Sequence, residues 1–145
     1  VGPFDPINPA CASEKDVEGW TSSGLIEWWG PRQRTQMPEI LAQAYVVVLP
    51  SYREGLPLVL AEASACGRPC ITNDVPGCRE VVSHGENGWL AKVRDAASLA
   101  SAIEEALASP EEAARRGRRA REIAVERLSL SSVREATLAV YRELF

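Results

Sequence analysis

A continuous apolar run constrains the fold of this chain more than any other feature. Residues 45–51 read YVVVLPS, a continuous apolar run, rich in β-branched residues, that stops at Pro50. The apolar side chains do not alternate with polar ones, as they would in a strand with one face in water. The run therefore predicts a strand covered on both faces, which is typical of a parallel sheet.

The segments around this run alternate between strand and helix patterns. We expect further strands at 25–30 (LIEWWG), 69–73 (PCITN) and 87–93 (NGWLAKV, after a turn), and helices at 37–44 (MPEILAQA), 57–66 (PLVLAEASAC) and, as a short turn, 77–85 (GCREVVSHG). Short loops join these segments. This alternation predicts an α/β fold, a Rossmann-like doubly wound parallel sheet.

After Asp95 nearly the whole sequence favours helix. Asp95 is placed to cap a first helix. Ser109 and Pro110 are placed to begin a second helix, whose first turn is acidic. A third helix is expected to begin at Ser129 or Ser131.

The start of the sequence predicts that this chain is a fragment. No signal peptide is visible, and residues 1–10 (VGPFDPINPA) read as the end of a strand running into a turn, not as a natural N-terminus. We therefore expect one domain over 1–145, taken from a longer protein. It would consist of an α/β sheet part at 1–94 and a helical part at 95–145.

The composition is that of an ordinary globular domain and excludes some partners. Hydrophobic residues make up 46% of the 145 residues and charged residues 25%. The formal net charge of −4 argues against a surface built for nucleic acid or an anionic membrane. The basic run RRGRRAR at 115–121 has glutamates on both sides, so we expect a solvated helix face. No apolar run approaches the roughly 20 residues of a membrane helix.

The four cysteines, Cys11, Cys66, Cys70 and Cys78, form no C-x-x-C pair. The last three could be combined with His84 as a zinc set, but that spacing matches no common zinc module. We expect small buried residues in a reducing cytoplasm instead.

The loop after the buried strand is the candidate binding site, because ligands of open α/β sheets bind beyond the carboxyl ends of the strands. Gly55 allows either a close backbone approach or an unusual dihedral angle. Pro57 suits the first position of the helix that follows. The unpaired N–H groups near Leu56, Leu58 and Val59 would then form an anion site together with the helix dipole.

Two glutamates accompany this predicted anion site. Glu62 lies in the second turn of the helix, from which a long side chain can reach back toward the ligand. A buried carboxylate needs a partner, and a ribose diol would supply one. Two other interpretations stay open: Glu54 as a solvated loop residue, and Glu62 paired with an arginine. The arginines considered are Arg53, Arg68 and Arg79.

Residues 50–95 resemble the C-terminal half of family 4 (group 1) glycosyltransferases, which are retaining enzymes of the GT-B fold. The family signature is E-G-x-P-x-x-x-x-E followed by A-x-A-x-G-x-P. The residues that match it are Glu54, Gly55, Pro57, Glu62, Ala63, Ala65, Gly67 and Pro69. VPGCREVV and GENGWLA also match the family pattern. The resemblance implies a partial C-terminal, nucleotide-sugar-binding GT-B domain without its N-terminal acceptor domain.

The resemblance implies a role for each matching residue of the loop and helix. Glu62 would hydrogen-bond the ribose of a nucleotide-sugar, and Glu54 would contact the hydroxyls of the donor sugar. The backbone amides of Leu56 and Leu58 would hold phosphate oxygens. Gly55, Leu56 and Pro57 would shape the loop around the sugar and the diphosphate.

By the same resemblance, Trp29, Gly30 and Arg32 would border the nucleobase. Trp28 and Trp29 are expected to pack rather than to stack on the base, as strand aromatics usually do. The loop at 75–78 would face the acceptor side of the cleft. His84 is interpreted as a loop residue, not as a base.

The implied activity is transfer of a sugar from a nucleoside diphosphate sugar to a glycan or lipid-linked acceptor in polysaccharide or glycoconjugate biosynthesis. A UDP-sugar is favoured over GDP-mannose, and no metal or other cofactor is expected. The family's basic Arg–Lys pair lies upstream of this segment, so the fragment is expected to be inactive alone. It would be cytoplasmic, and peripheral to the inner membrane through the absent half. The alternatives are a sugar-nucleotide epimerase of the same fold and a non-catalytic nucleotide-binding module.

Overall fold

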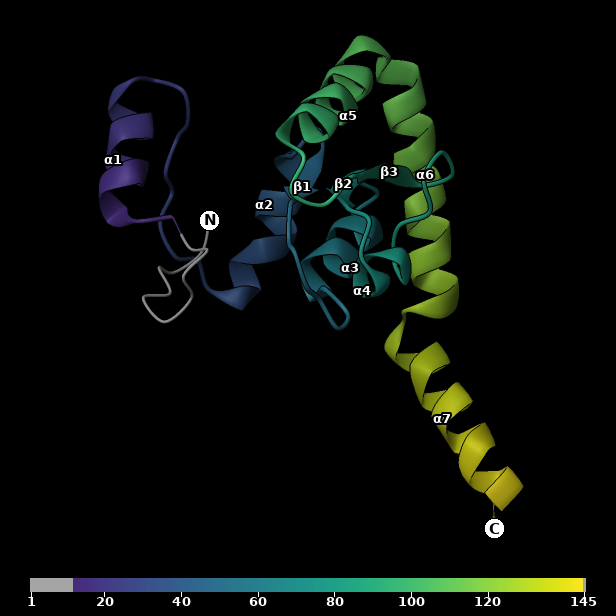
Figure 1. Cartoon of the computed structure of the whole chain (residues 1–145). Coiled ribbons are helices and arrows are strands. Elements are labelled where there is room, and N and C mark those ends of the chain that lie inside the picture. Colours follow the sequence, from purple (N-terminus) through teal and green to yellow (C-terminus); the bar gives the residue numbers. More distant parts are fainter. Residues whose placement is uncertain (1–11, 145) are drawn as a thin grey trace. The chain divides into compact units, whose positions relative to one another are not determined.

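A computed structural model describes residues 12–144 and divides the chain into two compact units, Val1–Met37 and Pro38–Phe145 (Figure 1). Each unit is described by itself. The strand-to-turn interpretation of residues 1–10 lies outside the described residues, as does Cys11. The expectation of a single domain, with a sheet part and a helical part, stays a prediction.

The first unit contains a helix that the sequence patterns above do not predict, α1 (Glu14–Ser22). A capping box begins it: the Ser13 hydroxyl accepts from the Asp16 amide at 3.2 Å, and the Asp16 carboxylate accepts from the Ser13 amide at 3.1 Å. A 3₁₀ turn, η1 (Arg34–Gln36), ends the unit. Residues 26–33 form neither helix nor strand, so the strand expected at 25–30 is wrong. A strand needs a partner for its backbone groups, and this segment is paired with none of the described strands.

The second unit is built on a three-stranded parallel sheet in the order β1-β2-β3. Its strands are β1 (Val47–Leu49), β2 (Cys70–Asn73) and β3 (Gly88–Ala91). Val48 is in register with Ile71, and Ile71 with Trp89. Every residue of the central strand β2 is buried, but Val48 on β1 is 38% exposed. Covering of both faces was predicted for β1 and is wrong there, since β1 lies at an edge of the described sheet.

Helices cover both faces of this sheet, which confirms the α/β expectation. They are α2 (Met37–Gln43), α3 (Leu58–Ala65), α4 (Pro76–Arg79), α5 (Ala96–Ala108) and α6 (Pro110–Arg127). Figure 1 shows α3 and α4 on one side of the sheet and α5 on the other. The core holds Ile71 and Trp89 against small residues of the helices, Ala102, Ala106 and Ala113. The long helix α6 packs against α3, α5 and β3.

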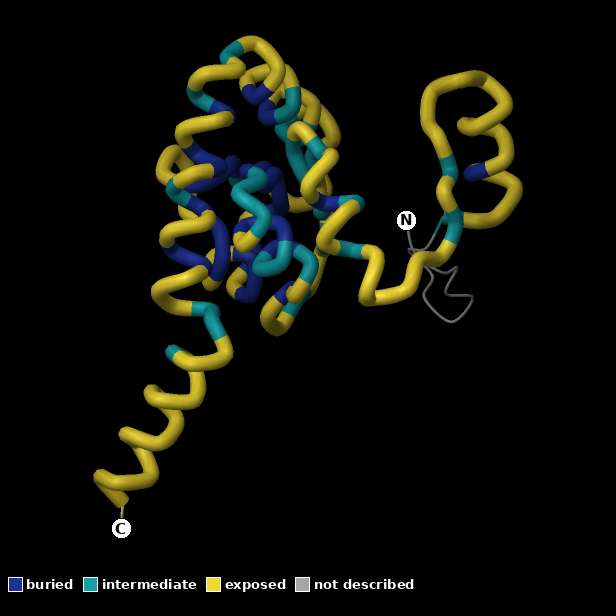
Figure 2. Tube along the Cα trace, turned by 180° about the vertical axis from the view of Figure 1, so that it is seen from behind, coloured by how far each residue is buried: buried dark blue, intermediate teal, exposed yellow. Residues whose placement is uncertain are grey.

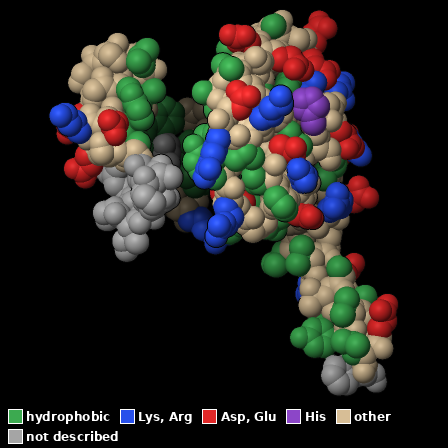
Figure 3. All heavy atoms as spheres, in the orientation of Figure 1, with side chains coloured by type: hydrophobic (Ala, Val, Ile, Leu, Met, Phe, Trp, Pro, Cys, Tyr) green, Lys and Arg blue, Asp and Glu red, His purple; other side chains and the backbone are tan. Residues whose placement is uncertain are grey.

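The caps expected in the helical part are largely confirmed. The Asp95 carboxylate accepts from the Ser98 amide at 2.9 Å at the start of α5. The last helix, α7 (Leu130–Leu144), directly follows Ser129, whose hydroxyl accepts from the Ser132 amide at 3.2 Å. No residue of α7 is buried (Figure 2), and hydrophobic side chains are visible along it (Figure 3).

The basic run on α6 is only partly the solvated face that the sequence suggested. Arg115 and Arg119 are charge-paired near the surface, with Glu112 and with Glu86 and Glu122. Arg116 is instead only 6% exposed, and its guanidinium lies 4.0 Å from the centre of the Trp89 ring. A buried cation is tolerated here because it is paired and stacked.

In the part of the chain that the structure describes, no helix combines the length and the apolar character needed to cross a membrane.

Candidate functional site

The two signature glutamates lie on one loop–helix unit at the carboxyl end of β1. Glu54 is half-buried in the loop, and Gly55 and Leu56 beside it are exposed. Glu62 is half-buried in the second turn of α3. The start of α3 thus lies between the two glutamates in the chain; their roles as binding residues stay predictions.

Gly55 has open space beside it. A Cβ at this position would meet no heavy atom within 4 Å, and Gly55 is not among the glycines with positive φ. Of the two reasons considered for this glycine, an unusual dihedral angle is therefore wrong. The other reason, room for a close approach to the backbone, stays a prediction.

Pro57 is the N-cap of α3, not its first helical residue as the sequence suggested. Its carbonyl accepts from the amides of Leu60 at 3.0 Å and Ala61 at 3.3 Å. The amides of Leu58 and Val59 are the first of the helix and have no carbonyl one turn earlier within it. Pro57 has no side-chain group that could cap them. The start of α3 therefore offers N–H donors and the positive end of the helix dipole.

Two of the arginines considered as partners of Glu62 make contacts elsewhere. Arg79 Nε donates to Asp74 Oδ1 at 2.5 Å, and this bond holds the pKa of the Asp74 carboxyl below its ordinary value. Arg68 donates to the carbonyl of Ala42. The interpretation of Glu62 as the partner of an arginine stays open.

The last two residues of β2 hold the end of β1 and the start of the loop that carries Glu54. The Thr72 hydroxyl donates to the carbonyl of Leu49 at 2.7 Å, and Asn73 Nδ2 donates to the carbonyl of Ser51 at 3.1 Å. Both side chains are buried. The sequence analysis missed this contact, although polar residues that directly end a buried strand are a signal for such bonds.

Gly77, in the short helix α4 that follows β2, also lies against the Glu54 loop. A Cβ at Gly77 would lie 2.1 Å from the carbonyl oxygen of Gly55 and 2.3 Å from that of Glu54. The loop at 75–78 thus lies directly against the Glu54 loop. Its predicted place on the acceptor side of a cleft stays a prediction.

The buried thiols near this site are protected rather than reactive. Burial raises the pKa of the Cys78 thiol; its bond with Thr72 opposes the rise, and the negative charge of Glu54 adds to it. Burial raises the pKa of Cys70 to about 12. Among residues 12–144, no three His, Cys, Asp or Glu side chains are grouped to hold a metal ion, so the zinc set of Cys66, Cys70, Cys78 and His84 is not assembled.

Trp29, Gly30 and Arg32 belong to the first unit. Trp29 and Arg32 are exposed, and the Trp29 indole donates to a Glu27 carboxylate oxygen at 3.1 Å. Gly30 has a φ of +67°, which a glycine adopts without strain. These residues lie in irregular chain between α1 and η1; their predicted role beside a nucleobase stays a prediction.

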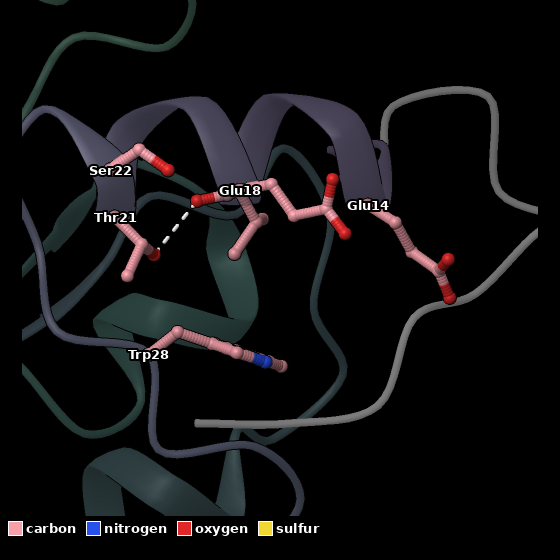
Figure 4. A pocket seen from close by; sticks show the side chains of 6 residues that line it. Glu14, Glu18, Thr21, Ser22 and Trp28 are labelled. Atoms are coloured by element: carbon pink, nitrogen blue, oxygen red, sulfur yellow. Dashed lines mark hydrogen bonds between the residues drawn. The ribbon is translucent and has the colours of Figure 1, made fainter.

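A pocket of about 280 Å³ also lies within the first unit, between α1 and Trp28 (Figure 4). Its lining residues are Glu14, Val17, Glu18, Thr21, Ser22 and Trp28. The Thr21 hydroxyl donates to the Val17 carbonyl at 2.8 Å. None of the predicted site residues lines this pocket, so it is separate from the loop–helix unit.

The fold and the loop–helix unit define a class of protein. It is a doubly wound α/β protein with a candidate site, at the carboxyl end of a parallel strand, for a ligand that carries both an anionic group and hydroxyls. The sequence profile of the family "Glycosyl transferases group 1" matches residues 23–123, more than half of the chain. The chain belongs to this family of glycosyltransferases.

Individual relatives agree with this assignment. The chain is 36% identical over 96 residues to the N,N'-diacetylbacillosaminyl-diphospho-undecaprenol alpha-1,3-N-acetylgalactosaminyltransferase of Campylobacter jejuni, a match that covers 66% of this chain and 24% of that protein. The chain spans about a quarter of the length of the curated relatives it matches.

Solved structures share the fold. Sucrose-phosphate synthase from Thermosynechococcus elongatus superposes with a TM-score of 0.84 at 32% identity, over 99% of this chain and 37% of that one. A mutant of S. aureus TarM in complex with fondaparinux, alpha-GlcNAc-glycerol and UDP superposes with a TM-score of 0.77 at 25% identity, over 88% of this chain and 26% of that one. These likenesses confirm that the chain has the fold of GT-B glycosyltransferases.

Proposed function

We propose that this chain is the donor-binding part of a retaining glycosyltransferase that transfers a sugar from a nucleoside diphosphate sugar, with UDP favoured, to a glycan or lipid-linked acceptor. One observation carries the proposal. In a member of the glycosyltransferase family, Glu54 and Glu62 lie on one loop–helix unit at the carboxyl end of β1, with the start of α3 between them.

Each part of this unit has a proposed task. Glu62 accepts hydrogen bonds from the ribose hydroxyls, and Glu54 accepts them from hydroxyls of the donor sugar. The first amides of α3, with that of Leu56 before them, bind phosphate oxygens and stabilise the charge that develops on the leaving diphosphate. Gly55 leaves room for the sugar beside the loop.

In the proposed reaction an acceptor hydroxyl oxygen bonds to the anomeric carbon of the donor sugar. The bond from that carbon to the diphosphate oxygen breaks, the nucleoside diphosphate leaves with the electron pair, and the proton of the acceptor hydroxyl passes to the departing diphosphate. The proposal uses N–H donors for the leaving charge and requires no metal ion. The site of action is the cytoplasm, at the inner membrane where the acceptor is lipid-linked.

Two relatives support the choice of substrates. The Campylobacter jejuni relative is named for transfer of N-acetylgalactosamine to a diphospho-undecaprenol compound, which is a lipid-linked acceptor. The TarM structure contains UDP. Both fit a UDP-N-acetylhexosamine or UDP-hexose donor for this chain.

The test is an assay of the full-length protein with a panel of UDP- and GDP-sugars and lipid-linked or glycan acceptors. Release of nucleoside diphosphate is measured, and the product's anomeric configuration is determined by NMR. We expect Glu54→Ala and Glu62→Ala each to lower kcat/KM roughly 10- to 100-fold, the effect of losing about 1.5–3 kcal/mol of charged hydrogen bonding. Glu104→Ala, which removes an exposed glutamate from another helix, is the matched control and should behave like wild type.

Other outcomes would identify a different protein. Nucleotide binding without turnover would favour a non-catalytic module. Epimerisation of the donor without an acceptor would favour an epimerase. Transfer that is unaffected by both glutamate variants would show that the loop–helix unit is not the donor site.

A further inference from the structure

The position of Glu54 depends on a second segment of the chain, residues 72–77, which we call the supporting segment. Its first contacts are two hydrogen bonds from the buried side chains of β2: Thr72 donates to the carbonyl of Leu49 at the end of β1, and Asn73 donates to the carbonyl of Ser51 in the Glu54 loop. Asn73 is only 3% exposed. The Asn73 bond thus joins the start of the loop to the central strand β2.

The last contact of the supporting segment is between Gly77 and the backbone carbonyl groups of Glu54 and Gly55. Gly77 is buried, and the carbonyl groups of Glu54 and Gly55 occupy the space that a side chain would fill. Gly77 does not have a positive φ, so its own backbone does not demand glycine. The close approach of the loop is therefore the reason that a glycine is needed here.

If Gly77 carried a side chain, the Glu54 loop would move and α4 would keep its position. Gly77 is held in α4, where the amides of Cys78 and Arg79 both donate to the Val75 carbonyl at 3.1 Å. The loop is exposed at Gly55 and has open space beside it. A contact at 2.1 Å with a backbone oxygen cannot be relieved by a side-chain rotation, so the peptide between Glu54 and Gly55 must move.

We propose that Gly77 is a positioning residue for Glu54. Together with Asn73, it sets where the loop backbone lies and therefore where the Glu54 carboxylate meets the donor sugar. The inference rests on the role proposed for Glu54 above. It adds that the distance from Glu54 to the sugar is determined by the absence of a side chain at position 77.

The first test is Gly77→Ala in the full-length protein, assayed for sugar transfer. We expect kcat to fall roughly 10- to 100-fold, the effect of misplacing a catalytic group by about 1 Å. The donor KM should change much less, because the proposed ribose contact of Glu62 and the proposed phosphate contacts of the first α3 amides lie outside both the loop and the supporting segment. Asn73→Ser, which removes the bond to the Ser51 carbonyl, is a second variant with a smaller effect in the same direction, for use if Gly77→Ala does not fold.

A double-variant cycle separates positioning from general damage. If Gly77 acts through Glu54, the Gly77→Ala/Glu54→Ala double variant should have the same kcat as Glu54→Ala alone. Gly117→Ala is the matched control: its Cβ would lie 2.3 Å from the Gly67 carbonyl oxygen, a comparable clash of α6 with the turn that follows α3, away from the Glu54 loop in the sequence. It should lower Tm but keep kcat within about twofold of wild type, since it lies outside the loop.

The outcomes decide the inference independently of the proposed function. A folded Gly77→Ala variant with wild-type kcat overturns the positioning role, and so does a double variant whose losses multiply. If the wild type transfers no sugar at all, the proposed function fails. The positioning of the loop is then decided by NMR on this chain: amide shifts at 53–56 that move in Gly77→Ala and not in Gly117→Ala support it, and unchanged shifts overturn it.

Discussion

At the scale of single residues, two glycines of the site stand in opposite surroundings. Gly77 is closed in by the carbonyls of the Glu54 loop, whereas Gly55 has no heavy atom near the position of a Cβ. Packing within the chain therefore explains the glycine at 77 and not the one at 55. The proposed approach of a ligand to Gly55 can be tested by adding one methyl group.

We expect Gly55→Ala to leave the free energy of unfolding within about 1 kcal/mol of wild type, because its backbone is not in the left-handed region and the space is open. Affinity for the nucleotide-sugar should fall, since the methyl group would occupy the space proposed for the sugar. Thermal unfolding followed by circular dichroism and calorimetric titration of the full-length protein measure the two quantities.

The control for this change is Gly19→Ala on α1, another glycine with open space around its α-carbon. This variant should keep the free energy of unfolding within about 1 kcal/mol of wild type, and its donor affinity should not change. Unchanged donor affinity in Gly55→Ala would show that the ligand does not approach the loop at this point.

At the scale of secondary structure, Arg116 connects three elements. From α6 it pairs with Glu112 at 2.7 Å and with Glu105 of α5 at 3.1 Å. It also donates to the carbonyl of Gly88 on β3 at 2.9 Å and lies over the Trp89 ring. One buried cation thus joins α5 and α6 to β3, which ends near the candidate site.

We expect Arg116→Met to lower the free energy of unfolding by about 2–4 kcal/mol, because it removes several charged hydrogen bonds and leaves the Gly88 carbonyl without this donor. Chemical denaturation measures the change. Arg118→Met, an exposed arginine of the same helix, should change stability by less than about 0.5 kcal/mol. Equal effects of the two variants would contradict a special role for Arg116.

The sequence predicts elements well where the signal is local. The apolar run before Pro50 and the caps at Asp95 and Ser129 are contained within a few residues, and their elements are confirmed. The strand expected at 25–30 fails because a strand exists only with a partner, which an aromatic-rich pattern cannot supply. The helix α1 was missed although Ser13 and Asp16 have capping-box spacing.

The same distinction applies to the candidate site. Glu54 and Glu62 belong to one short motif, so the sequence alone is enough to single them out. The support from Asn73 and Gly77 arises only when β2 is laid beside β1, so no local pattern reports it. The sequence therefore identifies the proposed binding groups, and the fold identifies what holds one of them in place.

At the scale of the whole molecule, the charge pairs of α6 make stability depend on pH. Hydrogen bonds from Arg115 and Arg116 lower the pKa of Glu112 from its ordinary value of 4.5 to about 2. A carboxyl whose pKa is lower in the folded state stabilises the fold when it is charged. Its contribution is fully present above the unfolded value near 4.5, and it is lost as the pH falls toward 2.

We therefore expect wild-type Tm to fall more steeply between pH 5 and pH 2 than that of Glu112→Gln, which cannot lose this charge. Other carboxyls with lowered pKa values, Asp16 and Asp74, titrate in both proteins and cancel in the difference. Thermal unfolding of both proteins across this range measures it. Because Glu112 is partly exposed, high salt should reduce the difference in Tm at pH 5. Parallel pH profiles for the two proteins would show that the Glu112 pairs do not contribute to folding.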